Sequence, residues 1–181
     1  LMKLGGGAEL ASPLGAFTVP NISPDRATGI GDWSTVDFVN ALRFGVSPQG
    51  EHFYPAFPYA SYQHITLEDL IDLKAFLDTL PAVDNRVAAT SLPFPFSIRR
   101  GIGLWKRLYV TDPGFTPDPD FSETENRGAY LVTGPGHCGE CHTPRTVFFG
   151  MDKSRWLAGA PALEGKGTVP DITPGGREIG G

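Results

Sequence analysis

Both cysteines of this 181-residue chain lie in one short stretch, Cys138-Gly139-Glu140-Cys141-His142. Two thiols separated by two residues and followed at once by a histidine form the attachment motif of a c-type haem. In that chemistry the thiols bond to the haem vinyl groups, and the adjacent histidine becomes an axial ligand of the iron. The motif therefore predicts a covalent haem c attached through Cys138 and Cys141, with His142 as the proximal iron ligand.

Three other uses of paired cysteines compete with haem attachment. A thioredoxin-type dithiol requires a strand before the motif and a helix after it, and the sequence shows no such alternation. A zinc site requires a fourth ligand, and only His137, directly before the first cysteine, is near. A plain disulfide would leave His142 unexplained. The sequence favours haem and leaves the dithiol and zinc interpretations open.

The composition predicts a small folded protein whose short helices are joined by long ordered loops. Glycine (23) and proline (17) together exceed a fifth of the 181 residues, which suits a core that a cofactor completes. The net charge of -5 argues against nucleic acid as a partner. No apolar run reaches the roughly 18 residues that a membrane span needs. Leu1 is not a natural initiator residue, so we expect the chain to begin inside a longer reading frame.

Helix-capping patterns place the main helices. Three segments begin with Ser or Thr followed three residues later by Asp or Glu, a combination that caps helix N-termini. They predict helices that start at Ser34, Thr66 and Ser122 and that run to about Phe44, to just before Pro81 and to about Val132. Weaker helical patterns cover residues 98–108 and 154–158, and residues 1–32 and 45–65 are expected to form ordered loops.

One seven-residue segment occurs twice. Thr18-Val19-Pro20-Asn21-Ile22-Ser23-Pro24 recurs 150 residues later as Thr168-Val169-Pro170-Asp171-Ile172-Thr173-Pro174, which two similar units would explain. The second copy begins 26 residues after His142. The same spacing in the first unit places a Cys-x-x-Cys-His motif about eight residues before Leu1. The repeat therefore predicts a second haem, attached upstream of Leu1.

The surroundings of the cysteine motif resemble a known family. The motif is preceded by Arg127-Gly128-Ala129-Tyr130-Leu131-Val132 and continues as Thr143-Pro144-Arg145. Together with the segments 20–25, 55–59 and 93–96, these residues resemble the multihaem (diheme or triheme) cytochrome c subunits of bacterial periplasmic dehydrogenases, the alcohol dehydrogenase cytochrome c subunit type. The resemblance covers nearly the whole chain.

The resemblance implies an all-α fold of tandem cytochrome c-like domains with long loops, joined by a strap rich in proline and phenylalanine. We expect a first domain over residues 1–83 that lacks its N-terminal haem-attachment segment. A connector then covers residues 84–121, and a second domain over 122–181 ends before its distal ligand. The resemblance also implies a periplasmic location on the outer face of the inner membrane, where regions outside this chain would provide any membrane association.

The resemblance further implies an electron-transfer subunit that is not itself an enzyme. A periplasmic dehydrogenase of the molybdenum or quinoprotein type would supply the electrons, and a quinone or a terminal oxidase would accept them. The alternative is a haem enzyme, a peroxidase or a thiosulfate-oxidising cytochrome, with an open or His-ligated iron. One departure from the family motivates this alternative. The family commonly has methionine at the position of Phe57 as sixth ligand of the first haem, and a phenyl ring cannot bind iron.

Other side chains are candidates for roles around the two haem groups. His64 and His52 are the donors nearest to Phe57 and are candidate distal ligands of the first haem, with simple packing or solvation as the competing interpretation. Met151 follows His142 too closely to be the distal ligand in the family pattern, so we expect it to pack.

Two further residues are candidates in the second unit. Arg145 is predicted either to neutralise a haem propionate or to lie on the surface. The backbone carbonyl of Pro170 is predicted to orient His142 through the ring nitrogen that does not bind iron.

Overall fold

The computed structural model describes residues 4–12, 14–111, 114–162 and 167–176. Its helices are α1 (Thr35–Phe44), α2 (Tyr59–Tyr62), α3 (Leu67–Asp78), α4 (Arg100–Tyr109), α5 (Glu123–Thr133) and α6 (Gly139–His142), with a 3-10 turn, η1 (Lys153–Arg155). Two antiparallel hairpins join β1 (Glu9–Ser12) to β2 (Gly15–Thr18) and β3 (Ala160–Pro161) to β4 (Thr168–Val169). The chain therefore consists of short helices joined by long loops, with a few short strands, whereas the sequence predicted no strand.

The three predicted helix starts are confirmed. Ser34 Oγ accepts a hydrogen bond from the Asp37 backbone N–H at 3.1 Å, and the Asp37 carboxylate accepts one from the Ser34 N–H at 3.0 Å. Ser122 forms the same capping box at the start of α5, and Thr66 caps α3. The weak pattern at 98–108 becomes α4. The pattern at 154–158 yields only η1, because Leu157 adopts a left-handed φ of 61° that leaves the helical path.

The main apolar core lies in the first half of the chain, between α1 and α3. Its buried members are Ile30, Phe38, Ala41, Leu42, Ile65, Leu70 and Leu77. The charged residue on the inner face of α3, Lys74, is buried and donates to both oxygens of Asp78 at 2.6 and 2.7 Å. Leu70, Ile71 and Leu77 follow Leu67 at helical spacing, but Leu67 and Ile71 are exposed whereas Leu70 and Leu77 are buried. The buried face of α3 is thus narrower than the spacing of its apolar residues suggests.

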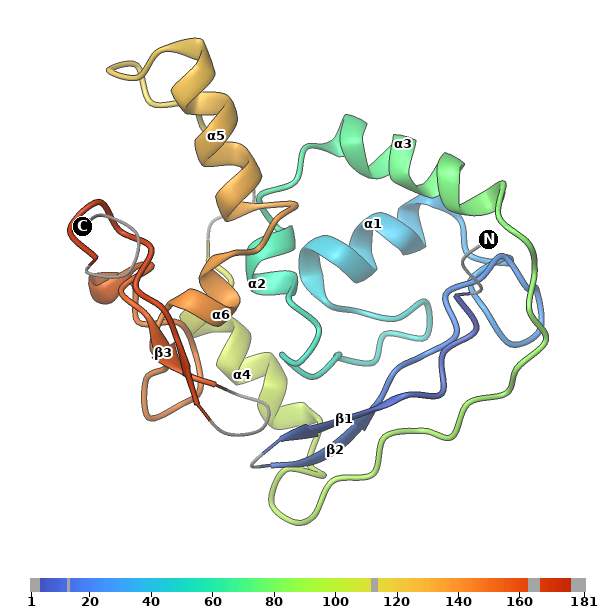
Figure 1. The fold of residues 1–181 in the computed structure, drawn as a ribbon. Helices are drawn as coiled ribbons and strands as arrows, with labels where there is room; N and C mark the ends of the chain where they lie inside the picture. The colour runs from blue at the N-terminus through green and yellow to red at the C-terminus, as the bar shows by residue number, and fades with distance from the viewer. Residues whose placement is uncertain (1–3, 13, 112–113, 163–166, 177–181) are drawn as a thin grey trace.

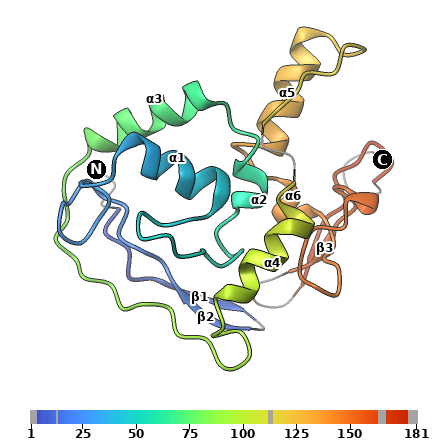
Figure 2. The ribbon, with the colours of Figure 1, turned by 180° about the vertical axis from the view of Figure 1, so that it is seen from behind.

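Figures 1 and 2 show the first and second halves of the chain on opposite sides, with α4 between them. The strap that follows α3 runs around the first half, beside the β1–β2 hairpin, before it enters α4. Leu92 is its buried anchor, and Thr90 Oγ1 accepts a hydrogen bond from Thr18 N at 3.0 Å. Phe94, in contrast, is 81% exposed. Among the described residues, no helix is both long and apolar enough to cross a membrane.

The repeated segment is also a repeat of local backbone geometry. Each copy begins in a β-strand, since Thr18 is the last residue of β2 and Thr168 the first residue of β4. In the first copy, Asn21 Oδ1 accepts from Ser23 N at 3.0 Å and Ile22 N donates to Leu4 O at 3.0 Å. In the second copy, Asp171 Oδ1 accepts from Thr173 N at 2.8 Å and Ile172 N donates to Leu157 O at 3.1 Å. The two segments therefore share one local fold, as related units would. The domain boundaries themselves stay predictions.

Gly45 ends α1 and at the same time makes room for α2. Its backbone is left-handed, with φ 58° and ψ 44°, a conformation that costs other residues energy. A Cβ atom added to Gly45 would lie 2.4 Å from Cδ1 of Tyr59, the fully buried first residue of α2. Only glycine satisfies both requirements.

We therefore expect Gly45→Ala to lower the free energy of unfolding by more than the about 1–2 kcal/mol that left-handed strain costs, because Tyr59 must also move. The matched control is Gly50→Ala, since Gly50 has φ 82° and a Cβ atom added there would meet no heavy atom within 4 Å. The Gly50→Ala control should lower the free energy of unfolding only by the cost of the left-handed backbone strain. Thermal or denaturant unfolding measures both, and equal losses would contradict the close packing of Gly45 on Tyr59.

Candidate haem site

The two cysteines lie on the single turn of α6. Cys138 is its N-cap and Cys141 its third residue, so their side chains stand one turn apart on the same side. His142 N donates to Cys138 O at 3.0 Å, which closes the turn. Both thiols are free, with Cys138 half-buried and Cys141 exposed. Neither cysteine residue is buried.

The imidazole of His142 is oriented by a distant backbone carbonyl. Its Nδ1 lies 2.8 Å from the carbonyl oxygen of Pro170, 28 residues further along the chain. A carbonyl can only accept a hydrogen bond, so Nδ1 must carry the proton and Nε2 has the lone pair that a metal binds. The His142 carbonyl oxygen in turn accepts from Gly159 N at 2.8 Å. The expected contact between His142 and Pro170 is present, while the roles of both in haem binding stay predictions.

This donor set fits a c-type haem better than its competitors. Two free thiols and an imidazole with its proton on Nδ1 are the groups that such a cofactor requires. The element before α6 is the helix α5, so the strand of a thioredoxin-type unit is missing at that place. Among the described residues, no three His, Cys, Asp or Glu side chains converge to hold a bare metal ion. The described part of the chain therefore offers no ligand set for zinc.

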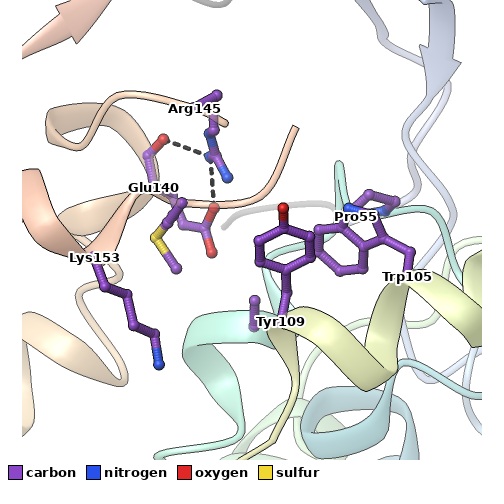
Figure 3. Close-up of a pocket in the computed structure, with 8 residues that line it drawn as sticks. Pro55, Trp105, Tyr109, Glu140, Arg145 and Lys153 are labelled. Carbon is purple, nitrogen blue, oxygen red and sulfur yellow. Dashed lines mark hydrogen bonds and ion pairs between the residues drawn. The ribbon is translucent and has the colours of Figure 1, made fainter. Parts of the chain in front are cut away.

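No sequence pattern singled out Glu140, which lies between the cysteines and is only 8% exposed. Its Oε1 accepts a hydrogen bond from Ser61 Oγ of α2 at 2.8 Å, and its Oε2 accepts one from Arg145 Nη2 at 2.7 Å. Arg145 Nη2 also reaches the Glu140 backbone oxygen at 2.7 Å, as Figure 3 shows. Arg145 is thus engaged by Glu140 and does not lie free on the surface. Its propionate role stays a prediction.

Aromatic residues surround the attachment turn on two sides. The Trp156 ring covers Gly139, where an added Cβ would lie 2.2 Å from Cη2 of the indole. His137, with φ 40°, contacts the edge of the Tyr62 ring at 5.5 Å between ring centroids. Burial raises the pKa values of Tyr59 and Tyr62, and the charge of Glu140 raises them further. The Glu140 carboxylate therefore lies close enough to α2 to disfavour ionisation of both tyrosines.

Helix α4 contacts both halves of the chain at this site. Trp105 Nε1 donates to Phe148 O at 2.7 Å, while the Trp105 ring meets the Tyr59 ring edge-on at 6.1 Å. Lys106 Nζ donates to the carbonyl oxygens of Phe44 and Gly45 at 2.6 and 2.7 Å, which places a positive charge at the C-terminus of α1. Burial lowers the pKa of Lys106 to about 8.

The two candidate distal histidines lie in different places. His52 Nδ1 accepts a hydrogen bond from Lys106 Nζ at 3.0 Å, and burial followed by the Lys106 charge lowers the pKa of His52. His64 Nδ1 donates to Gly114 O at 2.9 Å. His64 also lines a cavity of about 350 Å³ together with Met151 and Trp156 of the second half. The histidine roles as iron ligands stay predictions.

Phe57, at the position where the family commonly has methionine, packs edge-on against Phe53 and Tyr62, with ring centroids 5.8 and 5.5 Å away. It therefore extends the apolar core of the first half. Met151 lines both the large cavity and a pocket of about 10 Å³ beside Glu140 and Arg145. Figure 3 shows that pocket between α4 and the segment that follows α6.

Comparison with known proteins gives several relatives, although no protein-family model matches the chain. A protein named "Diheme cytochrome c-type" from Cereibacter sphaeroides is 53% identical over 96% of this chain and 58% of its own length. The fructose dehydrogenase cytochrome subunit of Gluconobacter japonicus is 40% identical over 94% of this chain and 35% of its own length. The cytochrome c subunit of alcohol dehydrogenase (quinone) from Gluconacetobacter polyoxogenes is 40% identical over 86% of this chain and 34% of its own length. The chain therefore spans between about a third and somewhat more than half of these relatives.

The packing of Trp156 on Gly139 leads to a stability prediction. Gly139→Ala forces a methyl group into the indole ring, so we expect a loss of about 1–3 kcal/mol in unfolding free energy. Gly128 of α5 has no heavy atom within 4 Å of its Cβ direction. Gly128→Ala should instead stabilise the protein by about 0.5–1 kcal/mol, because alanine favours a helix interior. Thermal unfolding of both variants measures these opposite changes in stability. An unchanged stability in Gly139→Ala would refute the close packing of Trp156 on Gly139.

Proposed function

Because this chain is homologous over nearly its whole length to cytochrome c subunits of bacterial dehydrogenases, we propose that it carries electrons from a dehydrogenase to a respiratory acceptor. The observation that supports this proposal most is the α6 turn, where two free thiols stand beside a histidine with its Nδ1 proton bound to Pro170 O. A haem c bound there would supply an iron that gains and loses one electron. The chain holds His142 in one tautomer and one ring orientation.

The relatives favour electron transfer over the haem-enzyme alternative, because their names describe cytochrome subunits of dehydrogenases. We infer that the substrate chemistry belongs to a separate dehydrogenase subunit, of the molybdenum or quinoprotein type. This chain would then oxidise no substrate alone. A quinone or a terminal oxidase would be the acceptor, and the word quinone in the name of one relative supports the former. The proposed location is the periplasm, as the family resemblance implies.

We also propose that the first half of the chain serves a second haem. The local fold that presents the Pro170 carbonyl to His142 recurs around Pro20, with the same backbone and Asn/Asp side-chain hydrogen bonds on either side. Pro20 would orient the histidine of a second attachment motif in the same way. The word diheme in the name of one relative supports this assignment.

Replacing the proximal histidine tests the site directly. His142→Ala removes the axial imidazole, so the visible spectrum of the haem in the second unit should change from low-spin to high-spin. The matched control is His137→Ala, which removes the neighbouring histidine that packs on Tyr62 and should leave the spectrum unchanged. If His137→Ala changes the spectrum and His142→Ala does not, the assignment of the proximal ligand is wrong.

Covalent attachment is measured by a pyridine haemochrome assay on the denatured full-length protein. We expect two or more haem groups per polypeptide, because each unit presents a proline carbonyl in the same local fold. The double variant Cys138→Ala/Cys141→Ala should contain one haem fewer, since it removes the only thiols of this chain. A denatured wild-type protein without covalent haem would contradict the proposed function. A count of one would contradict the second haem alone.

A further inference from the structure

Haem attachment uses Cys138, Cys141 and His142 but leaves the residue between the cysteines unexplained. Glu140 has 8% of its surface exposed, and Ser61, which donates to it at 2.8 Å, has 1%. The two residues are 79 positions apart in sequence, and Ser61 belongs to α2 in the first half of the chain. The contact therefore joins the attachment turn to an element that precedes α5 and the whole connector.

A buried carboxylate lowers stability unless donors satisfy both of its oxygens. Ser61 satisfies Oε1 and Arg145 satisfies Oε2, and the side chains of Arg145 and Glu140 are 18% and 10% exposed. The negative charge of Glu140 is thus balanced by one cation and one hydroxyl group. The balance depends on both halves of the chain, because Arg145 follows α6 while Ser61 comes from α2.

The attachment turn needs such support from outside. α6 has only four residues, and a helix of one turn is not stable unless the rest of the protein packs against it. Trp156 covers Gly139 within the second half, and α2 reaches the turn through Ser61. The Ser61 link can therefore be removed while the cysteines, the histidine and Trp156 are all retained.

We propose that Glu140 is a positioning residue, whose carboxylate binds Ser61 of α2 and so lets the first half of the chain set both the position of the attachment turn and the charge next to its haem. The proposal rests on the proposed function for its redox consequence. Its structural part concerns only α2 and α6. A residue in the first half then influences the haem of the second half through Glu140.

Three variants of the full-length, haem-loaded protein test the proposal. Ser61→Ala removes one donor from Glu140, so the negative charge beside the haem is less balanced and the midpoint potential should fall. Glu140→Gln removes that charge and leaves the Arg145 cation, so the potential should rise. Amide hydrogen exchange of residues 139–142 should become faster in Ser61→Ala, because α6 loses its tie to α2. In Glu140→Gln the exchange should change less, because the amide oxygen of glutamine still accepts the hydrogen bond from Ser61 Oγ.

The third variant, Ser23→Ala, is the matched control. Ser23 is also fully buried in the first half, but its hydroxyl bonds to Val83 and not to α6. The control should lose stability while both the midpoint potential of the haem at Cys138 and Cys141 and the α6 exchange rates stay at the wild-type values. Shifts of the same sign in Ser61→Ala and Glu140→Gln, or equal shifts in Ser23→Ala, would show a merely structural role and overturn the proposal.

Failure of this proposal can be told apart from failure of the proposed function. If the denatured protein carries no covalent haem, the proposed function fails, and hydrogen exchange on the same protein still decides whether Ser61 holds α6. Unchanged amide hydrogen exchange of residues 139–142 in Ser61→Ala would overturn the proposed link between α2 and α6. Faster exchange with an unchanged midpoint potential overturns the claim that the first half sets the charge at the haem.

Discussion

A carboxylate buried next to the attachment turn is the constraint that joins the two halves of this protein. Glu140 needs donors for both oxygens once it leaves water, and it finds them in Ser61 and Arg145. α2 must therefore lie against α6, and the tyrosines of α2 come close enough for the carboxylate charge to raise their pKa values. The position of α2 depends in turn on Gly45, because a side chain at this position would collide with the Tyr59 ring.

Around that contact, backbone carbonyls hold the charged and aromatic groups of the site. The Pro170 carbonyl selects the tautomer of His142, and those of Phe44 and Gly45 hold the Lys106 ammonium group at the end of α1. Trp105 of α4 donates to the Phe148 carbonyl in the second half while its ring meets Tyr59 in the first. Rigid main-chain acceptors would suit the proposed role in electron transfer, because a site that stays fixed reorganises little when its charge changes.

Much of the site follows from short-range patterns in the sequence. Cys138, Cys141 and His142 stand out because they match the fixed spacing of the haem-attachment motif. The capping residues Ser34, Thr66 and Ser122 place helix starts through contacts that span only three residues. The β-hairpins escaped prediction because they are short and rich in glycine and proline. Only a 3-10 turn forms at Lys153–Arg155, where a longer helix was predicted, because the backbone of Leu157 has a left-handed φ. No side-chain pattern in the sequence predicts that conformation.

Local chemistry in the sequence thus accounts for the attachment motif, the starts of the main helices and the repeated Val-Pro segment, since each depends on neighbours along the chain. The arrangement in space accounts for the rest: Ser61 on Glu140, Lys106 beside His52, and His64 in a cavity with Met151. Glu140 illustrates the difference, because its partner Arg145 lies only five positions further along the chain, whereas its partner Ser61 lies 79 positions away in α2. A contact between residues tens of positions apart produces no local pattern in the sequence around either residue. Only the folded chain therefore reveals which distant partner a buried charge contacts.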